Sequence, residues 1–89
     1  MSDWHLYLIR DRDQRLYTGI SRDVERRLVM HQNGTGARAL RGRGPLTLVW
    51  RSAVISHREA LRLEYAIKQW PKARKEALIR GEVGLPELA

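Results

Sequence analysis

Two short segments near the start of the chain alternate between apolar and polar side chains with a period of two residues, as strands of a β-hairpin do. They span residues 4–10 and 15–21, and the polar residues 11–14 separate them. The even positions carry core-type side chains, namely Trp4, Leu6, Leu8, Leu16 and Ile20. The odd positions include Tyr7 and Tyr17. The pattern predicts a strand pair with one side facing a core and the other forming a site.

The two tyrosines lie on the same side of this hairpin only with a suitable loop. Opposed residues of antiparallel strands point to one face, so Tyr7 and Tyr17 come together when the loop has three or five residues. A two-residue turn would separate them. Gly19, beside Tyr17, has two equally weighted interpretations. It lets substrate or the following helix approach the strand closely, or it marks a bulge or bend.

A helix is predicted over residues 22–32, with Ser21 as its N-cap and Gly34 just past its end. Its inward stripe consists of Val24, Leu28 and His31, and Arg27 lies beside that stripe. Residues 33–45 contain four glycines and three arginines without periodicity, which indicates a basic loop.

The second half of the chain predicts one more strand and one or two helices. Residues 46–53 alternate again, with Leu46, Leu48 and Trp50 on one face, and are expected to add a third strand to the hairpin. Residues 56–59 form a capping box that opens a helix running to about Trp70. Pro71 either ends this helix or starts a final one through roughly Arg80. We therefore expect an α+β domain over residues 1–81, with a three-stranded, mainly antiparallel sheet (β-hairpin, helix, third strand) flanked by two to three helices. Residues 82–89 would form a C-terminal tail.

Composition narrows the classes of function. A chain of 89 residues holds one domain, and its net charge of +7 with a pI near 10.8 is typical of proteins that bind nucleic acid. Without a run of about twenty apolar residues or a signal-peptide pattern, we expect a cytoplasmic protein with no membrane partner. The absence of cysteine excludes disulfides and thiolate zinc sites. Oxygen ligands would favour a hard cation such as Mg²⁺ or Mn²⁺.

Glu64 is the residue that the helical pattern singles out. It lies within the apolar stripe of the second predicted helix, which consists of Ala60, Leu63, Ile67 and Trp70. A carboxylate on such a stripe is costly unless something positive meets it, and an arginine or lysine is a commoner partner than a metal ion. Periodicity alone therefore leaves both explanations open. Taken singly, the tyrosines, Arg27 and His31 are ordinary strand and helix residues.

The order of these residues is more specific than any one of them. His5-Leu6-Tyr7 is followed ten residues later by Tyr17-Thr18-Gly19, then by Arg27 and His31 one helical turn apart, and by Glu64 on a later helix. Over roughly residues 4–80 this pattern resembles the GIY-YIG nuclease superfamily, and within it the small stand-alone YhbQ-like branch. The motifs depart from Gly-Ile-Tyr and Tyr-Ile-Gly but keep the tyrosines and the second glycine. Many superfamily nucleases also carry a late asparagine, and no asparagine follows Asn33.

The resemblance implies a role for each residue. Tyr7 would help to activate the attacking water, and Tyr17 would support it or position the phosphate. Arg27 would bind the scissile phosphate, and His31 would assist proton transfer or hold a tyrosine hydroxyl. Glu64 would hold the single Mg²⁺ or Mn²⁺ ion. Because a free tyrosine has a pKa of about 10, Arg27 and the metal would have to lower the pKa of Tyr7.

The predicted function is a metal-dependent endonuclease that hydrolyses phosphodiester bonds in DNA, more so than RNA, in repair, recombination or processing. Specificity would come from the basic loop, from the shape of single-stranded or structured DNA, or from a protein partner or dimer. Phosphate contacts are expected from six arginines, Arg10, Arg22, Arg26, Arg38, Arg41 and Arg43. Trp4 and Trp50 could stack on bases, although their apolar-side positions favour core packing.

Two other classes remain. The alternative is a nucleic-acid-binding module that keeps the nuclease fold with little or no turnover, and the missing asparagine favours it. A structural adaptor protein would require Glu64 to be buried against an arginine, far from both tyrosines.

Overall fold

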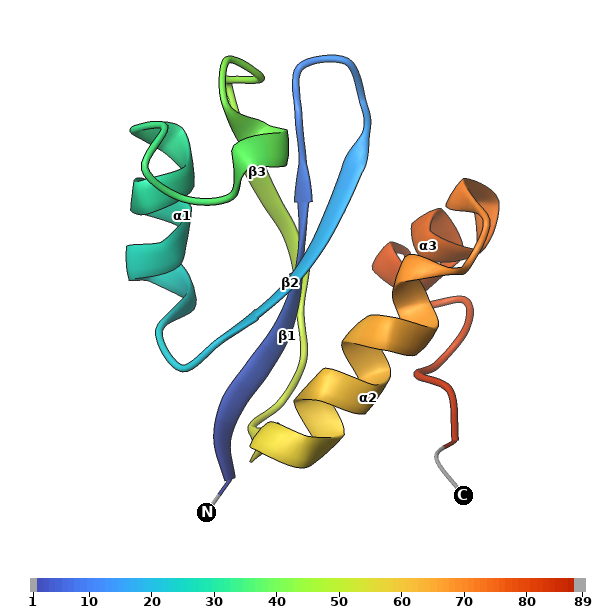
Figure 1. Ribbon diagram of the computed structural model, residues 1–89. Coiled ribbons are helices and arrows are strands. Elements are labelled where there is room, and N and C mark those ends of the chain that lie inside the picture. The colour runs from blue at the N-terminus through green and yellow to red at the C-terminus, as the bar shows by residue number, and fades with distance from the viewer. Residues whose placement is uncertain (1, 88–89) are drawn as a thin grey trace.

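The computed structural model describes residues 2–87 as an antiparallel sheet with helices on both sides (Figure 1). The elements in chain order are β1 (Ser2–Arg10), β2 (Leu16–Ser21), α1 (Val24–Gln32), the 3₁₀ turn η1 (Arg38–Leu40), β3 (Thr47–Arg51), β4 (Ile55–Ser56), α2 (His57–Lys68) and α3 (Lys72–Ile79). The strand order is β2-β1-β3, and β4 pairs with the beginning of β1. The predicted α+β fold is confirmed, and β4 is a short fourth strand that the sequence pattern did not indicate.

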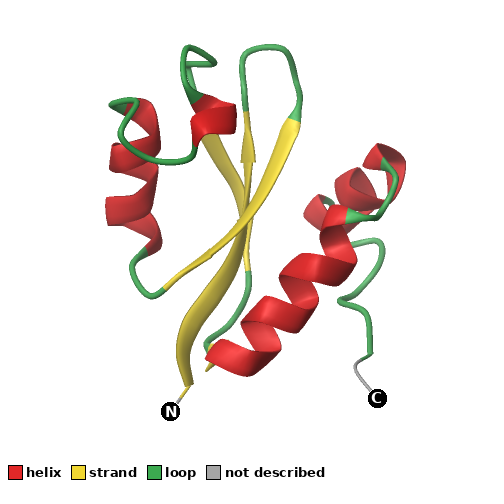
Figure 2. Ribbon diagram, viewed as in Figure 1, coloured by secondary structure: helices red, strands yellow, loops and turns green. Residues whose placement is uncertain are grey.

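Strand β1 is the centre of the sheet, and β2 is its outer strand next to the site. Helix α1 lies on one side, while α2 and α3 lie on the other (Figure 2). None of the described helices is long and apolar enough to cross a bilayer.

The hairpin loop has five residues, 11–15, as the shared face of the tyrosines requires. The Asp11 carboxylate closes it by accepting hydrogen bonds from the N–H groups of Asp13 (2.8 Å) and Arg15 (2.9 Å). In the resulting register Tyr7 faces Gly19 and Ile9 faces Tyr17. The two tyrosines therefore occupy neighbouring pairs on one side of the sheet.

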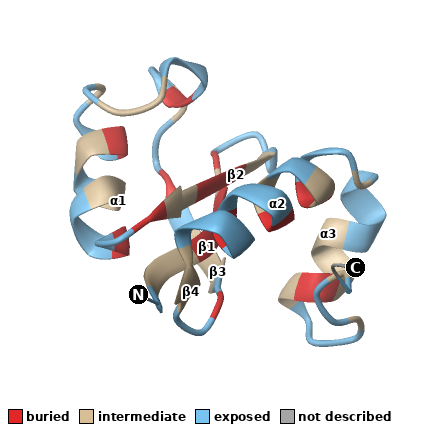
Figure 3. Cartoon of the chain, turned by 60° about the horizontal axis from the view of Figure 1, so that its bottom comes forward, coloured by how far each residue is buried: buried red, intermediate tan, exposed pale blue. Residues whose placement is uncertain are grey.

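Residues 6–9 of β1 are buried, and their side chains alternate between the two sides of the sheet (Figure 3). On the side of α2 and α3, the core contains Leu6, Leu8, Leu63, Ile67 and Leu78. On the side of α1, a second cluster contains Tyr7, Ile9, Val24, Leu40 and Leu46. The expectation of one core side and one open site side is therefore incomplete, because the site has a small core of its own.

Strand β3 departs from simple alternation. Leu8 pairs with Trp50 while the next residue, Ile9, pairs with Leu48, so the register shifts at Val49. Leu48 consequently packs with the Tyr7 cluster and Trp50 with the opposite core. The predicted common face of these two residues is wrong, because one extra residue in a strand reverses the side that each following residue faces.

The N-cap of α1 is Asp23, and the predicted Ser21 cap is wrong by two residues. The Asp23 carboxylate accepts a hydrogen bond from the N–H of Arg26 at 3.1 Å. Ser21 forms the preceding turn, since its hydroxyl oxygen accepts from the N–H of Asp23 at 3.0 Å. At the other end Gly34 has a φ of +77°, the left-handed conformation expected just past a helix.

The remaining helices follow their sequence signals. The Ser56 hydroxyl accepts from the N–H of Glu59 and caps α2, which confirms the predicted capping box. Helix α2 ends at Lys68, and Pro71 stands at the N-cap of α3, so the chain has a separate third helix. Past α3, Val83 packs against the core, and residues 88–89 of the predicted tail lie outside the described residues.

Candidate active site

The odd side of the hairpin meets α1 in a cluster of aromatic and polar side chains. Tyr7 comes from β1, Tyr17 from β2, and His31 from the last turn of α1. The Tyr7 hydroxyl lies 2.9 Å from His31 Nε2, and both residues are at most 2% exposed. The Tyr17 ring stands edge-on to His31 at a centroid distance of 5.4 Å. The structure thus brings together three of the predicted site residues.

The second nitrogen of His31 determines the direction of that hydrogen bond. The N–H of Ala37 donates to His31 Nδ1 at 3.0 Å. A neutral imidazole carries a single proton, so this acceptor role places the proton on Nε2. His31 therefore donates to the Tyr7 oxygen, and the Tyr7 O–H remains available to donate elsewhere.

Two glycines leave room for this pair. A Cβ on Gly19 would lie 2.5 Å from the Tyr7 hydroxyl oxygen, and one on Gly36 would lie 2.9 Å from His31 Cε1 and collide with Nδ1. Gly19 therefore accommodates the Tyr7 side chain itself. Neither interpretation of Gly19 from the sequence included this contact, and the β1–β2 register is continuous there.

Sequence reasoning missed Gly36 and Ala37 as part of the site. Both lie in the segment assigned to a basic loop, where glycines suggest flexibility. In the structure this part of the loop packs against the His31 ring. The Gly-Thr-Gly sequence two residues after the helix was the available signal, but it does not specify a contact with a side chain.

Burial controls the protonation of the pair. Burial raises the pKa of Tyr7 to about 12, the neighbouring Tyr17 and Glu64 act in the same direction, and Arg27 opposes them. Burial and then the Arg27 charge lower the pKa of His31 below 6.5. Arg27 thus acts on Tyr7 in the expected direction, but burial outweighs it. At neutral pH Tyr7 is a neutral hydroxyl and His31 a neutral ring.

Arg27 lies beside this cluster on the same helix. Its side chain is half-buried, with Nη1 3.9 Å from Met30 Sδ. Its charge acts on the pKa of both Tyr7 and His31. Arg27 also borders a hollow of about 400 Å³, so it connects the buried pair to open surface.

Glu64 approaches from the other side of the sheet. Helix α2 packs against β1 and β2 opposite α1, and the charge of Glu64 still acts on the pKa of Tyr7. The side chain is 20% exposed, and its Oε2 lies 3.5 Å from Lys68 Nζ. Glu64 is therefore ion-paired to a lysine one turn away rather than buried against an arginine.

The donor set around Glu64 limits the metal that it could hold. Within residues 2–87, no group of three or more histidine or acidic side chains converges as a metal site. Glu64 would be a single carboxylate ligand. That set fits Mg²⁺ or Mn²⁺, which keep several waters and accept phosphate oxygens, and it does not fit an ion that needs an all-protein cage.

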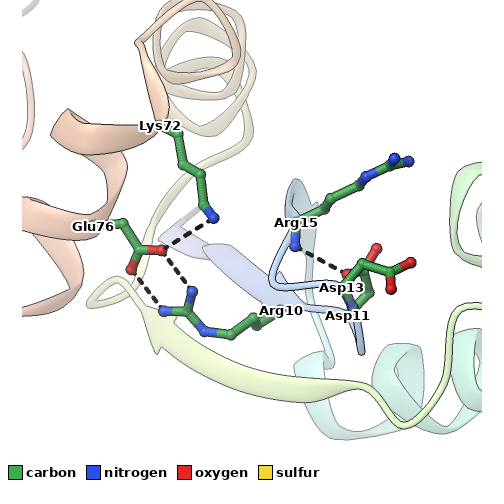
Figure 4. Close-up of polar contacts among 6 residues, drawn as sticks. All are labelled: Arg10, Asp11, Asp13, Arg15, Lys72 and Glu76. Carbon is green, nitrogen blue, oxygen red and sulfur yellow. Dashed lines mark hydrogen bonds and ion pairs between the residues drawn. The ribbon is translucent and has the colours of Figure 1, made fainter.

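The six arginines expected on the nucleic-acid surface differ in their contacts. The Arg10 guanidinium donates two hydrogen bonds to the Glu76 carboxylate, at 2.6 and 2.7 Å, and so links β1 to α3 (Figure 4). Lys72 pairs with the same carboxylate. Arg22 pairs with Asp3 and Arg43 with Asp13, while Arg41 donates to the Gly34 carbonyl. In the described part of the chain, the Arg26 and Arg38 side chains make no such contact, so these two are the most available for phosphates.

Comparison with known proteins agrees with this geometry. The GIY-YIG catalytic domain matches residues 3–77. The chain belongs to the GIY-YIG family. It is 58% identical over 83 residues to a UPF0213 protein of Cronobacter sakazakii, covering 93% of this chain and 87% of that protein. It is 53% identical over 88 residues to the UPF0213 protein YhbQ of Escherichia coli, covering 99% and 88%.

A solved structure supports the same assignment. The solution NMR structure of a UPF0213 protein from Bacillus halodurans is 40% identical to this chain, with a TM-score of 0.57 over 91% of this chain and 86% of that one. The family assignment identifies this GIY-YIG domain as a nuclease-type domain, for which nucleic acid is the substrate class.

Proposed function

We propose that this GIY-YIG protein is a divalent-metal-dependent endonuclease that hydrolyses phosphodiester bonds in DNA and acts in repair, recombination or processing. The observation that carries the proposal is the buried Tyr7–His31 hydrogen bond, with Arg27 beside it and the charge of Glu64 within electrostatic range. A buried, hydrogen-bonded tyrosine next to a cation is arranged to act on a phosphate at the surface of the cluster.

The side chains divide the work of hydrolysis. The Arg27 fork would bind two phosphate oxygens and offset their charge. The Tyr7 O–H, free to donate because His31 supplies the other hydrogen bond, would orient the attacking water. Tyr17 would position the phosphate from the other side of His31. Mg²⁺ or Mn²⁺ bound at Glu64 would neutralise developing charge and lower the pKa of a water.

With a pKa of about 12, Tyr7 does not act as a base by itself at neutral pH. Its hydrogen bond from His31 Nε2 favours the ionised form, and so does the Arg27 charge. Proton transfer to Tyr7 oxygen therefore depends on the fully assembled substrate complex, in which more positive charge surrounds it. The apo arrangement holds Tyr7 neutral and oriented.

Two surface hollows border the cluster along β2. The hollow of about 400 Å³ includes Arg27 and Ile20, and a second of about 290 Å³ includes Tyr17, Arg15 and Arg43. Ile20 and Tyr17 are three residues apart on this extended strand, or roughly 10 Å. A substrate strand that follows the outer strand β2 would therefore pass over Tyr17 and Arg27 with hollows on both sides.

Cleavage of labelled single-stranded, flap and duplex DNA, with Mg²⁺, with Mn²⁺ and with chelator, tests the proposal. Glu64→Gln should lower the rate on the order of 10²–10³-fold, because it removes the charge that holds the metal. Glu59→Gln is the matched control on the same helix, since glutamine preserves the capping box. Equal rates in the wild type and both variants would contradict the proposal, as would full activity in chelator.

A second candidate is a nuclease-fold module that binds nucleic acid without turnover. The Glu64–Lys68 ion pair and the raised pKa of Tyr7 favour it, because the first occupies the carboxylate that would hold the metal and the second keeps the Tyr7 hydroxyl neutral. This candidate predicts salt-sensitive binding that survives chelator and Glu64→Gln, with no product at high protein concentration. Metal-dependent product that disappears in Glu64→Gln would exclude it.

A further inference from the structure

We propose that the hollow beside Arg27 holds one unpaired base of a single-stranded substrate, next to the phosphate that Arg27 would bind. This inference rests on the proposed function, because it places the base relative to the scissile phosphate. We call this hollow the base groove. Its lining includes the apolar side chains of Trp4, Ile20 and Met30 and the charged side chains of Asp23, Arg26 and Arg27.

The base groove has a size and a lining that suit a nucleotide. Its volume of about 400 Å³ lies within the range of roughly 300–1,000 Å³ that small-molecule sites occupy. Trp4, Ile20 and Met30 supply apolar surface for the face of a base. Arg26 and Arg27 supply positive charge for the adjoining phosphates, and the Arg26 side chain has no ion-pair partner among residues 2–87.

Trp4 is held in place as an aromatic wall. Its ring stacks on His57 at a centroid distance of 4.1 Å with 15° between the planes. Trp4 is half-buried and lies beyond the end of β2, where the groove crosses the open edge of the sheet. Bases stack on aromatic side chains regardless of sequence, because every base has a π-face. Trp4 belongs to neither core cluster, so its ring is available as one wall of the groove.

The groove requires an unpaired base. In a duplex, each base is stacked on both sides and paired along its edge, and it must leave the stack to enter a protein pocket. The second hollow is lined by Tyr17 of the candidate active site together with Asp11, Arg15 and Arg43. Tyr17 would position the phosphate there, so we expect base contacts on the Arg27 side of the site and phosphate contacts on the Tyr17 side.

The test measures binding without cleavage. Fluorescence anisotropy in chelator compares a labelled strand of eight thymidines with a strand of the same length that carries abasic sites. Both probes have the same phosphate charge, so the difference reports the bases. The wild type should bind the base-bearing strand about tenfold more tightly, and a duplex should show no such gain. An RNA strand and its abasic counterpart, measured in parallel, test whether the same base contact forms with ribonucleotides.

Two variants locate the effect. Met30→Glu places a charge inside the base groove, while Val29→Glu places the same charge one residue away on the exposed surface of α1, where Val29 is 52% exposed. Each added charge should weaken the base-bearing and the abasic strand alike, since the two probes carry the same phosphates, but only Met30→Glu should abolish the preference for the base-bearing strand. Trp4→Leu should also abolish it, with Trp70→Leu as its control. Thermal unfolding verifies that each variant is folded. If Trp4→Leu does not fold, the comparison of Met30→Glu with Val29→Glu is sufficient to test the proposal.

Equal binding of base-bearing and abasic strands by the wild type, in DNA and in RNA, would overturn the proposal. So would a base preference that Met30→Glu retains. Base-dependent binding of DNA or of RNA that is lost only in the groove variants would support the proposal. These outcomes are independent of cleavage: a non-cutting protein can pass this test, and a nuclease without the base groove would fail it.

Discussion

The two sides of β1 are built from alternate residues of one strand, yet different interactions hold them. Leu6 and Leu8 face α2 and α3 through apolar contacts, and the buried Thr18 hydroxyl beside them has no hydrogen-bond partner within the described residues. Tyr7 faces α1 and is joined through His31 to the main chain at Ala37. Burial therefore serves stability on the side of Leu6 and Leu8. On the side of Tyr7 it serves orientation, because each buried polar group there has a hydrogen-bond partner.

The largest expected effect is a loss of stability on the apolar side. Leu8→Ala removes a fully buried side chain and should lower the free energy of unfolding by about 2–5 kcal/mol. Urea unfolding measures it. Leu61→Ala, on the exposed surface of α2, is the control and should change stability little. A small effect of Leu8→Ala would mean that this side is not the principal core.

On the site side, Tyr7→Phe should have the opposite balance of effects, with a large loss of cleavage and a small loss of stability. It removes one hydroxyl, so cleavage should fall on the order of 10²-fold, while stability should fall by only about 1–2 kcal/mol because His31 Nε2 loses its acceptor. Single-turnover cleavage and urea unfolding on the same samples separate the two effects. Wild-type cleavage by this variant would remove Tyr7 from the mechanism.

Gly36→Ala should disturb the site without touching the apolar core. The added Cβ meets the His31 ring, so the ring or the loop must shift, at a cost of about 1–3 kcal/mol. The ¹⁵N shifts of the His31 ring should then lose the signature of a single Nε2-protonated tautomer. Gly84→Ala, where the added Cβ meets open space, controls for the change of residue type. An unchanged His31 spectrum in Gly36→Ala would refute the packing role of Gly36.

Thr18→Val tests the apolar side in the stabilising direction. Replacing a buried, unpaired hydroxyl by a methyl group should raise the free energy of unfolding by about 1 kcal/mol. Thr47→Val, at an exposed position of β3, is the control. Destabilisation by Thr18→Val would indicate that its hydroxyl has a partner after all.

The smallest expected effect is a pH dependence that belongs to the site side alone. The folded-state pKa of His31 lies below its unfolded value, so the unfolded chain binds more protons in that window. The contribution to stability is complete above about pH 6.5 and is lost as the pH falls through the folded pKa. Urea unfolding at pH 7.5 and 5.5 measures it. His31→Gln should flatten this slope, and an unchanged slope would assign it to another group.

Local signals predicted most of the fold. The hairpin, the Ser56 cap and the boundary at Pro71 depend on residues close in sequence, and each appears in the structure. The wrong predictions for the α1 cap and for β3 also concern local sequence. The structure uses Asp23 as the cap of α1, two residues past the predicted Ser21, and a single extra residue in β3 reverses the sides of Leu48 and Trp50. Such choices depend on small local differences that period and propensity do not resolve.

By itself, the sequence determined that Tyr7 and Tyr17 share a face, that Arg27 and His31 lie one turn apart, and that Glu64 interrupts an apolar stripe. These are consequences of strand and helix periods. Only the tertiary structure decided that the loop returns over His31 and places the ring proton on Nε2, and that Gly19 and Gly36 make room for this pair. Those contacts join segments whose spacing in the chain carries no period, so only their packing in three dimensions specifies them.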